Sequence, residues 1–163
     1  MNEIEALYKK YAPDVFRFAF YLSGERSDAE DITSETFVRV WASPETIRAS
    51  TVRAYLFTIA RNLFLQDQRR STRHVALETH VPESRASPYD EIEQQSELAA
   101  VLARLQQLPE VDRAALVMRT NDGLSYEDIS QALQISVASA RVKVHRARRA
   151  LADLRDGSQR KSP

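Results

Sequence analysis

The segment Ser125–Leu151, SYEDISQALQISVASARVKVHRARRAL, combines two helix starts with a cluster of positive charge. Ser125 precedes an apolar stripe and Asp128 follows three residues later, which predicts a capped helix. Ser136 introduces a second helix in the same way. Two short helices separated by a tight turn have the spacing of a helix-turn-helix motif. The segment therefore predicts a helical DNA-binding unit in the last third of the chain.

The second of these helices has one apolar face and one basic face. Its packed stripe comprises Val137, Ala140, Val144, Ala147 and Leu151. Ser136, Ser139 and Arg141 lie in the first turns, where base edges are reached. The remaining cations are suited to phosphates and are Lys143, Arg146, Arg148 and Arg149. A basic face that only contacts solvent would explain the charge, but the preceding capped helix favours DNA binding. The turn has Gln134 where glycine is common, and a left-handed glutamine costs about 1 kcal/mol.

The chain as a whole is neutral, with 23 basic and 23 acidic residues among 163. The charges are nevertheless unevenly placed: residues 1–71 are balanced, residues 72–100 carry −4 and residues 101–163 carry +4. Such asymmetry indicates different partners for different parts of the chain.

Several function classes are excluded by composition. The chain has no cysteine, so disulfides and thiolate metal sites are excluded, and its three histidines (His74, His80 and His145) are too scattered to form a metal cluster. We expect no metal and no cofactor. The first residues lack a signal peptide and no apolar stretch is long enough to span a bilayer, which predicts a cytoplasmic protein without membrane insertion.

The apolar spacing predicts an all-α fold. A helix over Glu3–Leu22 should bend or restart at Pro13, and a second should begin at a Ser27/Glu30 capping box and end before Pro44. A third should follow Thr51 and end within DQRRSTR. Further helices are expected over Leu98–Leu108 and Glu110–Arg119. Residues 72–90 lose this periodicity and are interpreted as a flexible linker between two small domains.

Two parts of the sequence resemble one known family. The fourth conserved region of bacterial extracytoplasmic-function (ECF) sigma factors, of the sigma-70 family, is similar to DRAALVMRTNDGLSYEDISQALQISVASARVKVHRARRAL. Their second conserved region is similar to LYKKYAPDVFRFAFYLSGERSDAEDITSETFVRVW followed by RAYLFTIARNLFLQDQRR. Two unrelated motifs in the family's order make the resemblance specific.

The resemblance implies a sigma region 2 domain over residues 1–71 and a region 4 helix-turn-helix domain over residues 91–155. Residues 72–90 would be the linker and residues 156–163 a disordered tail. It also implies binding to core RNA polymerase and to promoter DNA, both duplex and single-stranded, and an anti-sigma factor as a further partner. The acidic linker residues Glu78, Glu83, Asp90 and Glu91 suit a positively charged polymerase channel.

Site residues follow from the matched motifs. The expected polymerase-binding surface comprises Asp28, Glu30, Asp31, Ser34, Glu35 and Phe37. Residues expected to contact the minus-ten element are Thr46, Ile47, Arg48, Ser50, Arg53, Tyr55, Arg61, Asn62, Arg69 and Arg70. Residues expected at the minus-thirty-five element are Ser136, Ser139, Arg141, Lys143, His145, Arg146, Arg148 and Arg149. Tyr55 equally fits the core stripe of its helix, and Asp28 and Glu30 equally favour a helix N-terminus.

Two other functions are weighed against the sigma factor. A transcriptional regulator would join the helix-turn-helix to a helical sensor or adaptor module, and would need a ligand cavity or phosphoacceptor in the front half. An enzyme would need a catalytic constellation, and neither a Ser/His/Asp set nor a glycine-rich phosphate loop is present in the sequence. We therefore predict that the chain is not an enzyme.

Overall fold

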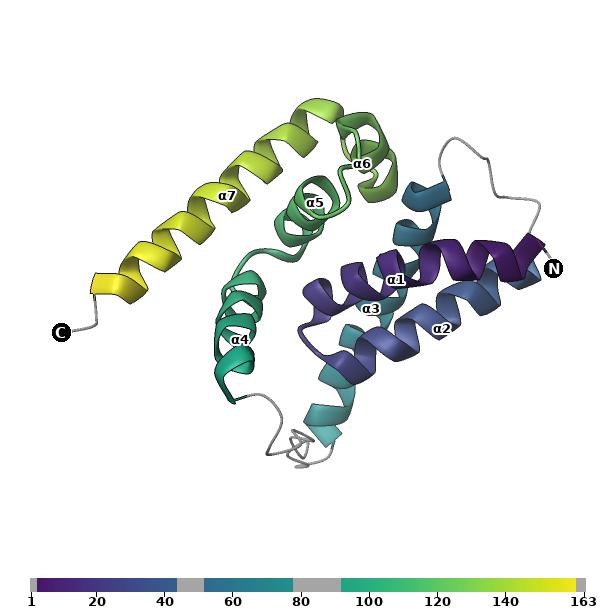
Figure 1. Cartoon of the computed structure of the whole chain (residues 1–163), viewed down its shortest axis with the longest axis horizontal. Helices are drawn as coiled ribbons and strands as arrows, with labels where there is room; N and C mark the ends of the chain where they lie inside the picture. The colour runs from purple at the N-terminus through teal and green to yellow at the C-terminus, as the bar shows by residue number, and fades with distance from the viewer. Residues whose placement is uncertain (1–2, 44–51, 78–91, 161–163) are drawn as a thin grey trace.

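The computed structural model describes residues 3–43, 52–77 and 92–160, and these form seven helices and no strand. The all-α prediction is confirmed. No described helix is both long enough and apolar enough to cross a membrane. The helices, shown in Figure 1, are α1 (Glu3–Ser23), α2 (Arg26–Ala42), α3 (Val52–Leu77), α4 (Ile92–Gln106), α5 (Glu110–Thr120), α6 (Tyr126–Leu133) and α7 (Val137–Arg160).

The first three helices form a bundle around aromatic side chains. The rings of Phe18 and Phe57 stack with their centroids 4.7 Å apart, and both side chains are fully buried. α1 continues through Pro13, so of the predicted bend or restart at this residue the restart is wrong. Proline removes one N–H donor, and burial of the α1 stripe over Val15 to Leu22 outweighs that loss.

The predicted capping box at the start of α2 is wrong. The N-cap is Glu25, which makes no side-chain cap hydrogen bond, and Ser27 already lies inside the helix. Gly24, at φ +76°, instead turns the chain sharply between α1 and α2. The Ser23 hydroxyl then accepts from the Glu25 N–H at 3.2 Å. The interhelix turn therefore fixes the start of α2, two residues earlier than the sequence pattern suggests.

Two helices run further than expected. α3 extends to Leu77, past residue 72 where the linker was expected to begin. α7 extends to Arg160, so residues 156–160 are helical rather than disordered. Each added residue gains one backbone hydrogen bond once a helix is nucleated, so helices continue where no strong breaker stops them. The expected linker residues 78–90 and tail residues 161–163 lie outside the described residues.

Local signals in the helix-turn-helix are confirmed. The Ser125 hydroxyl accepts from the Asp128 N–H at 3.1 Å, and the Ser136 hydroxyl accepts from the Ser139 N–H at 3.0 Å. Gln134 is left-handed, at φ 55°, and ends α6. The predicted strained turn is thus present and is stabilised by hydrogen bonds from the Gln134 and Ile135 N–H groups to carbonyls of α6.

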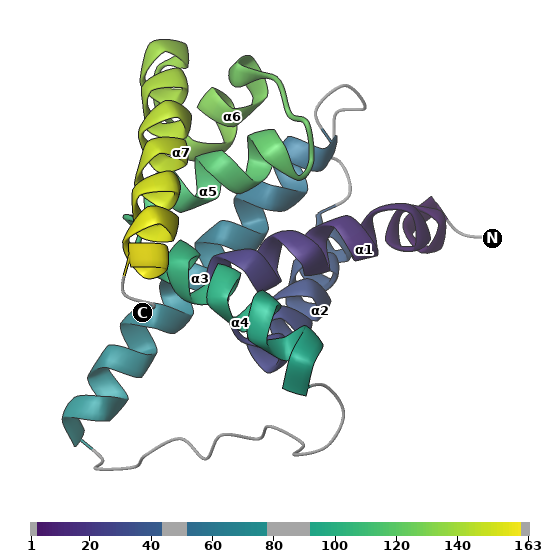
Figure 2. The ribbon, with the colours of Figure 1, turned by 60° about the vertical axis from the view of Figure 1, so that its left-hand side comes forward.

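The bundle of α1–α3, called the front bundle below, and the bundle of α4–α7, called the second bundle, correspond to the two expected domains. They pack directly against each other and share one continuous hydrophobic core. α3 packs on α6, and α1 packs on α4 and α5, as the two views in Figures 1 and 2 show. The helix-turn-helix therefore rests on the front bundle in this structure. Sequence periodicity predicted each bundle but gave no indication of this contact.

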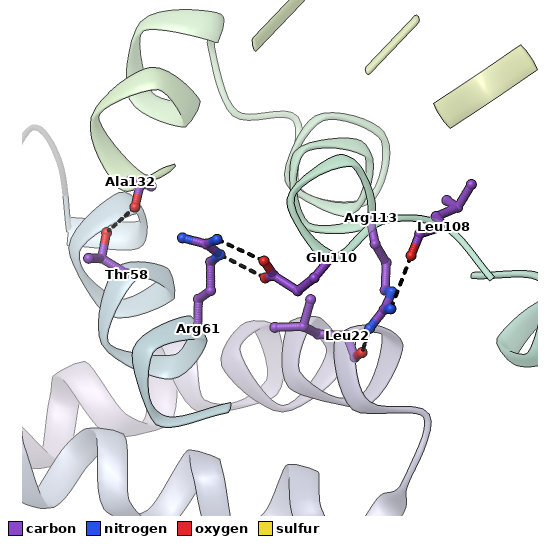
Figure 3. Close-up of polar contacts among 7 residues, drawn as sticks. All are labelled: Leu22, Thr58, Arg61, Leu108, Glu110, Arg113 and Ala132. Carbon is purple, nitrogen blue, oxygen red and sulfur yellow. Dashed lines mark hydrogen bonds and ion pairs between the residues drawn. The ribbon is translucent and has the colours of Figure 1, made fainter. Parts of the chain in front are cut away.

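Polar groups complete the contact between the bundles (Figure 3). The buried Arg113 guanidinium donates to the Leu22 carbonyl at 2.6 Å and the Leu105 carbonyl at 2.9 Å. It also donates to the Leu108 carbonyl at 3.2 Å, and burial lowers its pKa. The Gln106 side-chain amide lies 3.3 Å from the Leu22 carbonyl. Helix ends leave carbonyls without intrahelical donors, and here the second bundle supplies donors to the end of α1.

Asp122 is the poorly satisfied group at this contact. Its carbonyl accepts from Arg53 at 2.7 Å, but its side-chain Oδ2 is buried with no hydrogen-bond partner among the described residues. Burial, with a smaller contribution from Asp14, raises the Asp122 pKa from 3.8 to about 6. Arg17 and Arg53 oppose that rise.

Asp122→Asn should make the free energy of unfolding less dependent on pH between about pH 4 and pH 6. The folded-state pKa lies above the unfolded value, so this carboxyl favours folding when protonated, and its contribution is lost as pH rises from about 4 to about 6. At pH 7 the variant should be more stable by about 1 to 2 kcal/mol, allowing for partial solvent screening. Urea unfolding between pH 4 and pH 8 measures this. The exposed Asp153→Asn is the control, and a profile identical to wild type would contradict the assignment.

Candidate functional site

The basic face of α7 is directed away from the core. Val144, Ala140 and Ala147 are fully buried, whereas the cations on the opposite side of the helix remain accessible. Arg141, His145, Arg148 and Arg149 are exposed, and Lys143 is half-buried. Ser136 and Ser139 form the N-terminal cap of the helix, so both lie at its start as predicted. The structure thus gathers the expected minus-thirty-five residues on one helix.

Arg146 differs from its neighbours because a carboxylate holds it. Its Nε and Nη2 donate to the two Asp112 oxygens at 2.8 and 2.9 Å. The Asp112 side chain is buried, whereas the Arg146 side chain is 57% exposed. The hydrogen bonds to Asp112, followed by its charge, raise the Arg146 pKa. Arg146 is therefore oriented by α5, and the sequence gave no signal for this pair because 34 residues separate its members.

A ring contact also involves the start of α7. The Tyr126 ring, on α6, lies under the guanidinium carbons of Arg119 at 4.3 Å and Arg141 at 5.3 Å. Sequence reasoning missed Tyr126 and Arg119, since nothing in their spacing relates them to Arg141.

An acidic face is found on α2. Asp28, Glu30, Asp31, Ser34 and Glu35, all expected to contact the polymerase, are exposed. Burial raises the pKa of Asp28, and the nearby carboxylates of Glu25, Asp67 and Asp31 raise it further. Asp67 belongs to α3, so two helices contribute to one negative surface.

A groove between α2 and α3 extends this acidic face. It has a volume of about 560 Å³, and Asp31, Glu35, Asp67 and Arg70 are among its lining residues. Arg70 was expected at the minus-ten element, yet here it lies among the acidic residues of α2 and α3. Phe37, expected on the outer polymerase-binding face, is instead buried with its ring edge against Tyr8, at 5.0 Å between centroids. Its position in the helix turns it toward α1, so it supports the surface from within.

An apolar edge borders the acidic face and was not predicted. Trp41 is 65% exposed, and Val38 is 56% exposed. Together with Ile4 and Tyr8 they line a depression of about 380 Å³ between α1 and α2. Exposed large apolar side chains beside charged ones are typical of protein-binding surfaces.

The residues expected at the minus-ten element are spread along α3. Asn62, Arg69 and Arg70 are exposed, and Tyr55 is half-buried against the core. Arg53 donates to the Asp122 carbonyl and lies 3.6 Å from an Asp14 carboxylate oxygen. Thr46, Ile47, Arg48 and Ser50 lie outside the described residues.

Arg61 forms an ion pair with Glu110 of the second bundle (Figure 3). Its Nε and Nη2 each donate to a Glu110 oxygen at 2.7 Å, a two-point ion pair with α5. The side chains of Arg61 and Glu110 are only 14% and 20% exposed. A candidate strand-binding cation is thus covered when the bundles are packed together.

Within the described residues no three His, Asp or Glu side chains gather as a possible metal site. The described surface presents a basic helix, an acidic helix pair and an apolar edge. A capped basic helix-turn-helix beside a separate acidic and apolar face is typical of DNA-binding proteins that also contact a protein partner.

Comparison with known proteins refines this class. Residues 7–74 match the model of sigma-70 region 2, and residues 98–151 match that of sigma-70 region 4. The chain is 38% identical over 160 residues to the ECF RNA polymerase sigma factor SigE of Mycolicibacterium smegmatis, covering 94% of this chain and 62% of that protein. It is 34% identical over 155 residues to SigL of Mycobacterium tuberculosis, covering 91% and 86%.

A solved structure gives the same result. The sigma factor RpoE of Bartonella quintana, determined in complex with the anti-sigma factor NepR, is 27% identical with a TM-score of 0.79. The match covers 96% of this chain and 98% of that one. The chain belongs to the ECF group of RNA polymerase sigma factors, which are regulators of transcription. The alternative regulator is not favoured, because the front half is sigma region 2 and not a sensor module.

Glu110→Gln should loosen the contact between the bundles. The change removes the charge that compensates the half-buried Arg61, and we expect a loss of about 1 to 3 kcal/mol of stability. Because the chain lacks cysteine, labels can be placed at Arg26→Cys and Asp153→Cys. Energy transfer between them should then report a wider distance distribution. The exposed Glu97→Gln is the matched control, and unchanged distances with an unchanged unfolding midpoint would contradict the role of this pair.

Proposed function

We propose that this chain binds core RNA polymerase as its sigma subunit and directs it to specific promoters. The observation that carries the proposal is the presence, in one chain, of the region 2 bundle with its acidic face and the region 4 helix-turn-helix with its basic face. The polymerase performs the catalysis, and the site of action is the cytoplasm, where polymerase and DNA meet. Start-site-specific transcription in vitro with purified core polymerase tests this proposal.

We assign polymerase binding to the outer surface of α2. Asp28, Glu30, Asp31 and Glu35 present carboxylates there. Arg39 lies 3.6 Å from Glu35 and is about half exposed, so this pair is solvent-screened and can rearrange when a partner binds. The apolar edge with Val38 and Trp41 would add buried area beside these charges. Opposite charges on the partner would then give specificity and the apolar edge would give affinity.

Promoter DNA is assigned to two separate surfaces. The minus-thirty-five element would lie against α7, with Arg141 reading a base edge and Lys143, His145, Arg148 and Arg149 near phosphates. The minus-ten element would lie along α3 with Arg53, Tyr55, Arg61, Asn62 and Arg69, together with Thr46, Ile47, Arg48 and Ser50. Arg70 and Arg146 have carboxylate neighbours, and we place them at the edges of the two DNA surfaces.

The division into residues 1–71, 72–90 and 91–155 remains our proposal for the polymerase-bound chain. In the packed arrangement Arg61 is paired with Glu110, so strand binding by Arg61 requires the two bundles to separate. An anti-sigma factor is proposed as a further partner, by analogy with the complex formed by the similar sigma factor RpoE. It would act by holding the chain away from polymerase.

Asp31→Asn combined with Glu35→Gln should weaken core polymerase binding about tenfold or more. Both side chains are exposed, so removing their charges subtracts attraction to a basic partner without opening the core. Fluorescence anisotropy with labelled chain measures the affinity, and thermal unfolding checks the fold. Glu97→Gln combined with Asp153→Asn is the charge-matched control on other helices. Equal affinity for the two double variants would rule out this surface.

Binding of duplex DNA by the full chain should fall steeply with salt. Each phosphate neutralised by a cation contributes a slope of about −0.9 to the logarithmic plot of affinity against salt. Arg148→Ala combined with Arg149→Ala should therefore make the slope less negative by roughly 2. The exposed Arg17→Ala combined with Arg26→Ala provides the control, since these residues lie on α1 and α2. A flat salt dependence of the wild type would contradict a phosphate-dominated interface.

A further inference from the structure

The start of the recognition helix is contacted by an aromatic ring from the neighbouring helix. Tyr126 is the first residue of α6, directly after the cap Ser125. Its ring lies 5.3 Å from the guanidinium carbon of Arg141, which is exposed in the second turn of α7. Guanidinium groups are attracted to the faces of aromatic rings at such distances. Arg141 is therefore held before any DNA arrives.

The ring itself is fixed by its surroundings. Tyr126 is half-buried and packs against the hydrophobic core. The guanidinium carbon of Arg119 lies 4.3 Å from the same ring, and Arg119 Nη1 donates to the Leu124 carbonyl at 2.9 Å. Arg119 is thus tied to the loop before α6. A ring held by the core and by Arg119 can support the more exposed Arg141 side chain.

Rigidity matters differently for bases and for phosphates. A guanine edge is recognised by two parallel hydrogen bonds from one guanidinium, which requires a defined side-chain orientation. An exposed arginine samples many rotamers, and fixing one of them on binding costs entropy. A phosphate contact tolerates many orientations because it depends mainly on charge. Support of Arg141 by a ring therefore favours base reading over general DNA affinity.

We propose that Tyr126 is a positioning residue for promoter recognition, which holds Arg141 in the orientation that reads a guanine of the minus-thirty-five element. The proposal rests on the proposed function, in which Arg141 is the base-reading residue of α7. Tyr126 acts through Arg141 and needs no contact with DNA.

The test compares Tyr126→Leu, which keeps an apolar side chain but removes the ring, with Tyr126→Phe, which keeps the ring. Holoenzyme reconstituted from core polymerase and each full-length variant is bound to a library of randomised promoter-length duplexes, and the bound DNA is sequenced. Tyr126→Leu should lower the preference for one base pair about three- to tenfold, with average binding to the library nearly unchanged. Tyr126→Phe should keep the wild-type preference. Tyr11→Leu is the matched control, because Tyr11 is also half-buried with a cation over its ring, from Lys10, but lies on α1.

Arg141→Ala separates this proposal from the function on which it rests. The variant should lose preference at the same base pair, and adding Tyr126→Leu to it should cause no further loss. If Arg141→Ala leaves every preference unchanged, the base-reading role of Arg141 is wrong and the positioning role falls with it. If Arg141→Ala has the expected effect but Tyr126→Leu weakens all sequences equally, or Tyr126→Phe loses the preference, the positioning role alone is overturned.

Nuclear magnetic resonance of the wild-type chain keeps the proposal testable even if Tyr126→Leu fails to fold. The ring should shift the Arg141 guanidinium signal upfield, and Tyr126→Phe should preserve that shift. The signal is assigned with Arg141→Lys. An Arg141 signal at the position of a solvent-exposed arginine would overturn the proposal.

Discussion

The carbonyl groups at the end of α1 accept hydrogen bonds from the second bundle, and the packed structure depends on this contact. α1 has no basic residue in its last turn, and its final carbonyls need donors that the helix cannot supply. The Arg113 guanidinium on α5 provides one of these donors, to Leu22, and it also donates to the Leu105 carbonyl in the last turn of α4 and to the Leu108 carbonyl in the turn that follows. Because a buried guanidinium must satisfy its N–H groups, the positions of α1, α4 and α5 are fixed together.

Around this contact the structure pairs charges in two different ways. Between the bundles, Arg61 and Glu110 form a half-buried pair that depends on the packed arrangement. Within the second bundle, Arg146 and Asp112 form a pair that belongs to the helix-turn-helix itself. Separation of the bundles would release the first pair and leave the second intact. In the proposed polymerase-bound chain, Arg61 on α3 would therefore be exposed while Arg146 on α7 keeps its hydrogen bonds to Asp112.

The sequence predicted helix starts well where the residues that determine them are close together in the chain. The caps at Ser125 and Ser136 depend on residues three positions apart, and the structure contains both hydrogen bonds. The Ser27/Glu30 capping box failed because Gly24 and the packing of α1 on α2 set the helix start instead. Phe37 and Trp41 share a periodic stripe, yet one is buried and the other exposed, since α2 contacts α1 on only part of that stripe. Periodicity alone cannot tell how far along a helix its neighbour extends.

The sequence by itself determined the all-helical class, the helix-turn-helix and the concentration of positive charge on its second helix. It did so because helix caps, turn residues and apolar spacing act over a few residues. Only the tertiary structure decided that the two bundles share a core, that Glu110 covers Arg61, and that Tyr126 lies under Arg141. These contacts join residues from different helices, and their energy depends on burial and orientation that exist only after the helices have packed.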